Sequence, residues 1–184
     1  NLFREKDQGE DRVNFFRFDK NERTYPFDKR FIKKFNNIFK YELITMYPDQ
    51  NPLYLLLSKK LKIKKENILF TPGSDSGLKY IFESYIHKND TVAYLWPTYA
   101  MVDVYTKLYQ VRSLKLKYND DLSLKKNSFS KIFHKKLKMI YIANPDQPTG
   151  TYIKGIELNK IINLAKKKKI IIVIDEAYID FVPK

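Results

Sequence analysis

Residues 170–178, Ile-Ile-Ile-Val-Ile-Asp-Glu-Ala-Tyr, decide the fold. The five β-branched residues at 170–174 predict a strand, and an unbroken apolar strand is typical of one buried on both faces of a sheet. Asp175 ends this strand, where a buried carboxylate is costly unless it is paired. A protonated ring nitrogen on a ligand would pair with it, and so would a Lys or Arg side chain. The residues alone leave both partners open.

The segments before this strand alternate between strand and helix. Strands are expected at 67–71, 91–95, 111–116 and 137–143, and helices at about 74–86, 98–109 and 155–167. Strands that alternate with helices of ten or so residues indicate βαβ units. The predicted fold class is therefore α/β, with a mostly parallel sheet sandwiched by helices.

The N-terminal part of the chain has a different pattern. A polar arm leads into residues 28–42, where apolar side chains at helical spacing predict an amphipathic helix. Pro52 suits the first position of a helix that runs to about Leu61. We therefore divide the chain into an arm with the first helix, residues 1–45, and a large domain, residues 46–184.

The composition is that of a folded protein without a metal or disulfide framework. Of the 184 residues, 43% are hydrophobic and 30% are charged, and there is no Cys. The lack of Cys excludes a disulfide scaffold, a Cys-ligated metal and a Cys nucleophile, and His87 and His134 are too few for a His-rich metal site. No apolar run reaches the 18 or so residues of a membrane span, and no signal peptide is visible. We expect no metal, no membrane partner and a cytoplasmic setting.

The net charge of +14 raises nucleic acid as a partner. However, the basic residues are 29 Lys and only 6 Arg, and bidentate recognition of phosphates and bases favours Arg. The Lys are spread along the chain, and their densest run, 166–169, lies between a predicted helix and a strand. We interpret the charge as a solvated surface and expect no nucleic acid partner.

Further distinctive loops follow the predicted strands, at the edge where parallel sheets bind ligands. The segment 73–75, Gly-Ser-Asp, opens a helix whose free N–H groups suit a phosphate, although Ser74 or Asp75 could instead cap the helix. The carboxylate of Asp75 would repel a phosphate unless it points elsewhere. Tyr99 either packs in the core or stacks on a flat ligand. The loop 144–150, Asn-Pro-Asp-Gln-Pro-Thr-Gly, is either a plain turn or a stiff holder of one polar group.

Together these motifs resemble the fold-type-I pyridoxal phosphate enzymes, and within them the histidinol-phosphate aminotransferase branch of the class I/II aminotransferases. The resemblance covers about residues 15–184. It rests on the order and spacing of residues 73–75, 97–99, 144–150 and 175–178, with support from Asn21-Glu22 and Tyr47-Pro48.

The resemblance implies pyridoxal 5'-phosphate as the cofactor and the large domain of these enzymes as the fold. Gly73, Ser74 and Asp75 would hold the cofactor phosphate. Tyr99 would stack on the pyridine ring, and Asp175 would pair with its protonated nitrogen.

The remaining roles implied by the resemblance concern the cofactor oxygen, the dimer and the substrate. Tyr178 would donate to the phenolic oxygen of the cofactor, and Gln147 stands where the family has Asn as a ligand of that oxygen. Tyr47 would reach the cofactor phosphate of the partner subunit, which implies a homodimer. Asn21 and Glu22 would contact the substrate.

The activity implied is that of an aminotransferase acting on a small, phosphorylated amino compound. An anionic substrate is expected because four cations lie in or near the arm: Arg17, Lys20, Arg23 and Lys29. The alternative on the same branch is a pyridoxal phosphate decarboxylase of a phosphorylated amino acid, of the phosphoserine or phosphothreonine type. A non-catalytic or nucleic-acid-binding domain is a third reading, and the motifs in register argue against it.

One expected residue has no match in the sequence. The resemblance places the Schiff-base lysine a few dozen residues after Asp175, whereas the chain ends at Lys184, outside the expected motif. We therefore expect the chain to be the N-terminal half of a longer enzyme, with a large domain that is incomplete at its C-terminus.

Overall fold

The computed structural model describes four stretches of the chain, residues 22–39, 42–125, 127–133 and 136–182. They belong to two compact units, one that ends at Ile68 and one that begins at Leu69. The predicted division after residue 45 concerns the domains of the whole protein and stays a prediction. Three residues with predicted roles lie outside the described stretches, Arg17, Lys20 and Asn21, and so does the terminal Lys184.

The first unit is helical where it is described. It contains α1 (Lys29–Ile38), α2 (Glu42–Thr45), α3 (Asn51–Leu61) and the 3₁₀ helix η2 (Lys65–Asn67). Helix α3 has Pro52 in its first turn, as predicted, and ends before Lys62, whose backbone is left-handed with φ 56°.

Helix α1 confirms the predicted amphipathic helix, over a shorter range than 28–42. Asp28 caps it by accepting a hydrogen bond from the Arg30 N–H at 2.6 Å. Aromatic rings four residues apart contact one another along one side, with centroid separations of 4.6, 6.4 and 5.5 Å between successive members of the series Phe27, Phe31, Phe35 and Phe39; the first two pairs are stacked and the third is tilted.

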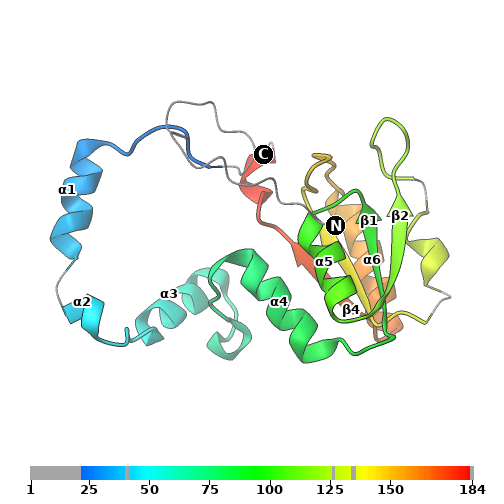
Figure 1. Ribbon diagram of the computed structural model, residues 1–184, viewed down its shortest axis with the longest axis horizontal. Helices are drawn as coiled ribbons and strands as arrows, with labels where there is room; N and C mark the ends of the chain where they lie inside the picture. The colour runs from blue at the N-terminus through cyan, green and yellow to red at the C-terminus, as the bar shows by residue number, and fades with distance from the viewer. Residues whose placement is uncertain (1–21, 40–41, 126, 134–135, 183–184) are drawn as a thin grey trace. The chain divides into compact units, whose positions relative to one another are not determined.

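The second unit is built on a parallel sheet, whose strands run from green to red in Figure 1. The strands are β1 (Thr91–Trp96), β2 (Arg112–Lys117), β3 (Met139–Ala143) and β4 (Ile171–Asp175), and their order across the sheet is β2-β1-β3-β4. The helices that alternate with them are α4 (Gly73–Tyr85), α5 (Ala100–Leu108) and α6 (Gly155–Lys167), with short 3₁₀ helices η3 (Ser130–Ile132) and η4 (Ile179–Phe181). The predicted α/β fold is confirmed.

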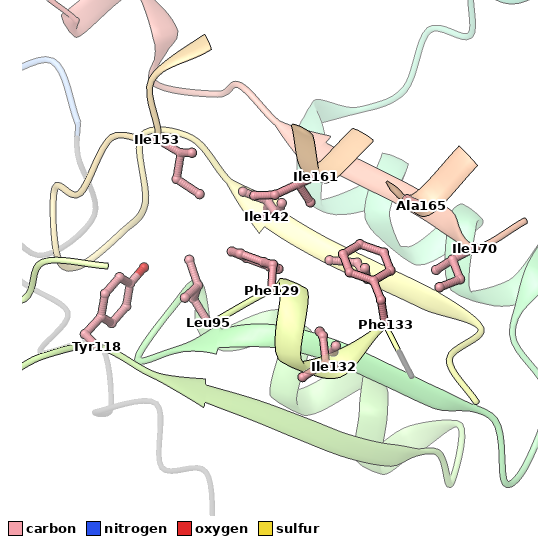
Figure 2. Packing of buried hydrophobic residues seen from close by; sticks show 12 residues of the cluster. Leu95, Tyr118, Phe129, Ile132, Phe133, Ile142, Ile153, Ile161, Ala165 and Ile170 are labelled. Atoms are coloured by element: carbon pink, nitrogen blue, oxygen red, sulfur yellow. The ribbon is translucent and has the colours of Figure 1, made fainter. Parts of the chain in front are cut away.

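The sheet has a hydrophobic core on each face, because successive strand residues point to opposite sides. Helices α4 and α5 cover one face, where Phe82 and Val102 pack against Tyr94 and Tyr141. Helix α6 and η3 cover the other. Figure 2 shows this second core, with Leu95, Phe129, Ile132, Ile142, Ile161 and Ala165 in one cluster.

Two strand predictions are wrong in part. No described strand pairs with residues 67–71, where η2 gives way to irregular chain and Leu69 is largely exposed. A strand forms only when a neighbour satisfies its backbone groups, and here none of the described strands does so. Residues 171–174 do form a strand, but they are only half-buried, because β4 is the edge strand of the described sheet. The strand buried on both faces is β3.

A buried carboxylate joins β1, β2 and α5. Asp103 on α5 accepts a hydrogen bond from the Tyr94 hydroxyl at 2.8 Å and forms ion pairs with Lys115 at 2.5 Å and Lys107 at 2.7 Å. Burial alone would raise the pKa of Asp103, but hydrogen bonds from Lys107, Lys115 and Tyr94 lower that pKa to about 2. The carboxylate is therefore charged in the folded protein at neutral pH.

We expect Asp103→Asn to lower the free energy of unfolding by about 1–2 kcal/mol at pH 7, since the folded pKa lies below the unfolded value of 3.8. The contribution of the Asp103 carboxylate to the free energy of unfolding is fully present above pH 4 and is lost as the pH falls toward 2. Urea unfolding of the intact protein at pH 7 and pH 3 should show a smaller difference at pH 3. The exposed Asp120→Asn is the matched control. Equal stability of Asp103→Asn and wild type at pH 7 would contradict the assignment.

Candidate active site

Loops at the carboxyl ends of β1, β3 and β4 surround one cavity in the second unit. They meet because the strands are parallel and because the register pairs Ala143 with Asp175. The cavity is lined by Ser74, Tyr99, Tyr141, Ala143, Pro145, Gln147, Asp175, Ala177 and Tyr178. Five of the predicted cofactor-binding residues are therefore brought together, from segments up to about a hundred positions apart: Ser74, Tyr99, Gln147, Asp175 and Tyr178.

The start of α4 has no side-chain cap among the described residues. Pro72 stands at the cap position, and the Gly73 N–H donates to the Thr71 carbonyl at 2.7 Å. Gly73 has φ +78°, a conformation that glycine adopts without strain. The capping alternative for Ser74 and Asp75 is thus wrong, and the positive end of the helix dipole stands at the cavity beside Ser74.

The carboxylate of Asp75 points toward α5. It accepts a hydrogen bond from the Tyr105 hydroxyl at 3.0 Å, and it is not among the residues that line the cavity. Burial, together with the hydrogen bond to Asp75, raises the pKa of Tyr105 to about 12, so Tyr105 remains a donor at neutral pH. Asp75 therefore connects the start of α4 to α5 through Tyr105. Its carboxylate is directed away from the position that an anion at Ser74 would take.

Asp175 receives neutral hydrogen-bond donors at the edge of the cavity. The Tyr141 hydroxyl donates to its Oδ2 at 2.9 Å, and the Ala177 N–H donates to its Oδ1 at 3.0 Å. Tyr141 is 1% exposed, and burial raises its pKa well above the ordinary value, so the phenol keeps its proton. In the described chain no Lys or Arg forms an ion pair with Asp175. A carboxylate so arranged can bind a cationic group that enters the cavity.

Gln147 and Tyr178 are adjacent, although they are far apart in sequence. The Tyr178 hydroxyl donates to Gln147 Oε1 at 2.9 Å. The family resemblance implies that both side chains bind one oxygen of the cofactor, and the structure places their polar ends together at the cavity.

The sequence left open whether Tyr99 packs in the core or borders a ligand site, and the structure shows that it does both. It precedes α5, lines the cavity and is half-buried, while also packing against the core under α4 and α5. One part of the side chain is therefore held by the core while another borders the cavity.

The loop after β3 is tied down by Asn144, a supporting residue that the sequence analysis missed. Its side chain is 1% exposed and makes two hydrogen bonds with the backbone of Ile153: Nδ2 to the carbonyl at 3.1 Å, and Oδ1 from the N–H at 2.7 Å. The Asn144 N–H donates to the Asp175 carbonyl at 2.8 Å. The loop is therefore more than a plain turn.

Tyr141 and Asp146 were missed as well. Tyr141 reads as one more apolar residue of a buried strand, and Asp146 reads as a turn residue. The signal that could have found Asn144 and Asp146 is a polar side chain directly after an all-apolar strand, which must be paired if it is buried.

Other predicted residues belong to the first unit. Tyr47 is fully exposed there, and Glu22 is half-buried. Arg23 lies over the Phe27 ring, 4.4 Å from its centroid. The roles proposed for these residues toward cofactor and substrate stay predictions. A larger hollow in the same unit contains none of the predicted cofactor-binding residues; it is lined by Pro48, Asp49, Gln50, Asn51, Tyr54, Lys65, Glu66 and Ile68.

The described residues include neither a metal cluster nor a helix that could span a membrane. No group of three or more His, Asp or Glu side chains is placed to hold a metal ion. None of the described helices has the length and apolarity to cross a membrane.

The sequence matches known proteins along most of its length. The profile of the family "Aminotransferase class I and II" matches residues 18–184. A histidinol-phosphate aminotransferase of Thermoanaerobacter sp. (strain X514) is 31% identical over 169 residues, which are 90% of this chain and 47% of that protein. One from Brachyspira hyodysenteriae is also 31% identical, over 91% of this chain and 46% of that protein.

The fold also matches solved structures. A crystal structure of histidinol-phosphate aminotransferase from Sinorhizobium meliloti, in complex with pyridoxal-5'-phosphate, superposes with a TM-score of 0.67 at 21% identity. The match covers 75% of this chain and 38% of that one.

The chain belongs to the class I and II aminotransferase family. Its parallel sheet has the fold of the pyridoxal phosphate-binding aminotransferases among the solved structures. The chain spans about half the length of the curated relatives it matches.

We expect Asn144→Ala to lower the free energy of unfolding by about 2–4 kcal/mol, because it leaves the buried backbone N–H and carbonyl of Ile153 without partners. Chemical denaturation measures the loss. Asn119→Ala is the matched control, because Asn119 also makes a side-chain hydrogen bond, to Ser123, but is exposed; its effect should stay within about 0.5 kcal/mol. If the two variants are equally stable, the loop does not depend on Asn144.

Proposed function

We propose that this chain is the cofactor-binding part of a pyridoxal phosphate-dependent aminotransferase. The observation that carries the proposal is the position of Asp175, a carboxylate held by Tyr141 and Ala177 at the edge of a cavity beyond a parallel sheet. Membership of the class I and II aminotransferase family supports it.

The chemistry of the cavity residues fits each part of this cofactor. Asp175 suits a protonated pyridine nitrogen, and Tyr99 suits the face of an aromatic ring. The pair of Gln147 and Tyr178 offers amide and hydroxyl groups to a phenolic oxygen. Ser74, at an uncapped helix start, suits a phosphate. The same cavity is therefore bordered by an acceptor for a cation, an aromatic face, a pair of hydroxyl and amide groups, and a site for an anion.

When bound, pyridoxal phosphate supplies an electron sink next to the substrate nitrogen. The chain's own residues orient it and set its protonation. The charge of Asp175 favours a proton on the ring nitrogen, and the two neutral donors on Asp175 fix the direction of its carboxylate. Tyr141 does not neutralise that charge, because its raised pKa means that the phenol keeps its proton at neutral pH and only donates a hydrogen bond.

Amino transfer is proposed in preference to decarboxylation because the relatives described above are named aminotransferases. The substrate is proposed to be a small amino compound with its own phosphate. Two observations support this: those relatives are named for a phosphorylated substrate, and the cations Arg17, Lys20, Arg23 and Lys29 lie in or near the N-terminal arm.

The remaining parts of the enzyme are proposed to lie in a longer chain and in a second subunit. The Schiff-base lysine would lie beyond the 184 residues, in agreement with a match to about half of each relative. Tyr47 would contact the cofactor phosphate of the partner subunit in a cytoplasmic homodimer, and Asn21 and Glu22 would contact the substrate.

We expect Asp175→Asn in the full-length protein to lose at least about 99% of amino transfer, because an amide does not hold the ring nitrogen protonated. The fold should persist, which circular dichroism and the unfolding midpoint check. Turnover with a saturating amino donor measures the loss. Asp180→Asn, an exposed acid five residues further on, is the control and should keep full activity. Near-normal turnover of Asp175→Asn would exclude the role.

A second expectation concerns the substrate. Small amino acids and amines, each assayed with and without a phosphate ester, should be converted at least about tenfold faster with the ester, because an ion pair at a water-excluded site is stabilising. The assay scores both amino transfer and release of carbon dioxide. Equal rates for both sets would end the proposal of a phosphorylated substrate. Carbon dioxide release without amino transfer would identify a decarboxylase.

A further inference from the structure

Asp146 is a buried carboxylate that the proposed chemistry does not use. It is 3% exposed, directly precedes Gln147, and does not itself line the cavity. Its Oδ1 accepts a hydrogen bond from the Thr98 hydroxyl at 2.6 Å, and its Oδ2 accepts a short one from the Tyr118 hydroxyl. Within the described stretches no cation forms an ion pair with it. Two hydroxyl donors therefore satisfy a charge that would otherwise be costly to bury.

The three members of this cluster come from three different loops. Thr98 follows β1, Tyr118 follows β2 and Asp146 follows β3, so the cluster joins the loops beyond three adjacent strands. Thr98 directly precedes Tyr99, and Asp146 directly precedes Gln147. Each of the two cavity residues is thus covalently next to a member of the cluster, and one carboxylate links them.

The backbone of Asp146 is fixed independently of its side chain. Its N–H donates to the Thr151 carbonyl at 2.9 Å, and its carbonyl accepts from the Gly150 N–H at 2.8 Å. The main-chain bonds hold the loop to itself. The carboxylate is what holds that loop to the segments that carry Thr98 and Tyr118.

We propose that Asp146 is a positioning residue whose carboxylate, through Thr98 and Tyr118, holds Tyr99 and Gln147 at the spacing that the bound cofactor needs. This inference rests on the proposed function. It assigns to Asp146 no contact with cofactor or substrate.

The cluster responds to pH. Burial raises the pKa of Asp146 to about 6; hydrogen bonds from Thr98 and Tyr118 oppose the rise, and the charge of Asp175 adds to it. The titratable groups that face it are Tyr118 after β2, Tyr141 on β3 and Asp175 at the end of β4. Burial raises the pKa of both phenols, so neither ionises near neutral pH. Below about pH 6 Asp146 gains a proton, and its hydrogen bonds to the two hydroxyls lose their charge assistance.

The direction of the effect on folding follows from the raised pKa. Because the folded pKa lies above the unfolded value of 3.8, the folded state binds the proton more tightly. Ionisation of Asp146 therefore lowers the stability of the fold as the pH rises from 4 to 6. At neutral pH the ionised carboxylate of Asp146 therefore lowers the free energy of unfolding, and a neutral residue at this position would not do so.

The test uses the full-length protein and pyridoxamine 5'-phosphate, which has the ring and phosphate of the cofactor but forms no Schiff base. Equilibrium dissociation constants are measured at pH 8 and pH 5 for wild type and Asp146→Asn. The variant is expected to bind about tenfold more weakly at pH 8 and within about twofold of wild type at pH 5, where Asp146 is itself neutral. The exposed Asp120→Asn should match wild type at both pH values.

Equal affinity of Asp146→Asn and wild type at pH 8 would overturn the inference. A tenfold loss of equal size at pH 8 and pH 5 would also overturn it, because it would reflect a general loss of packing. If Asp146→Asn does not fold, Tyr118→Phe is the replacement variant, because it removes one hydrogen-bond donor to Asp146 and keeps the ring. Tyr118→Phe should weaken binding of pyridoxamine phosphate several-fold at pH 8 only. Wild-type protein that binds no pyridoxamine phosphate would instead overturn the proposed function.

Discussion

The parallel pairing of β3 with β4 is the constraint on which the site depends. It sets Ala143 beside Asp175, and the Asn144 N–H extends the ladder by one bond to the Asp175 carbonyl. This register puts Asp175 on the same face as Tyr141, whose hydroxyl reaches its carboxylate. A slip of one residue would turn Asp175 to the opposite face of the sheet, toward α6. The hydrogen bond between Tyr141 and Asp175 therefore depends on this register.

The buried and half-buried carboxylates of this fold differ in the groups that surround them. Asp103 has two Lys partners, a pKa lowered to about 2 and no part in the cavity. Asp146 and Asp175 receive hydroxyl and amide donors, and the charge of Asp175 raises the pKa of Asp146. Negative charge is thus found at the cavity, on Asp175, and in the loop beside it, on Asp146, and no Lys or Arg of the described chain forms an ion pair with either carboxylate. This is the arrangement expected where a ligand supplies the positive group.

Apart from the strand expected at 67–71, the sequence predicted the elements around the cavity and the loops that meet there, because both follow from local pattern and from the rule that ligands bind beyond parallel strands. It did not predict contacts made across the fold. Tyr141 reads as an apolar strand residue until its hydroxyl meets Asp175, and Asn144 reads as a turn residue until it meets Ile153. The half-buried state of β4 depends on its edge position, which spacing along the chain does not reveal. The role proposed for Tyr47 involves a second subunit, so neither the sequence pattern nor this chain alone tests it.

The surroundings of Trp96 make its intrinsic fluorescence sensitive to the position of a nearby charge. Trp96 is the only tryptophan among the 184 residues, and it ends β1 directly before the segment 97–99. The ammonium group of Lys115, held by Asp103, lies 3.9 Å from the centroid of the indole ring. Indole emission changes with nearby charge, so a shift of the strand end relative to Lys115 alters the fluorescence without an added label. A cation anchored over a single indole ring thus makes movement at the end of β1 visible in solution.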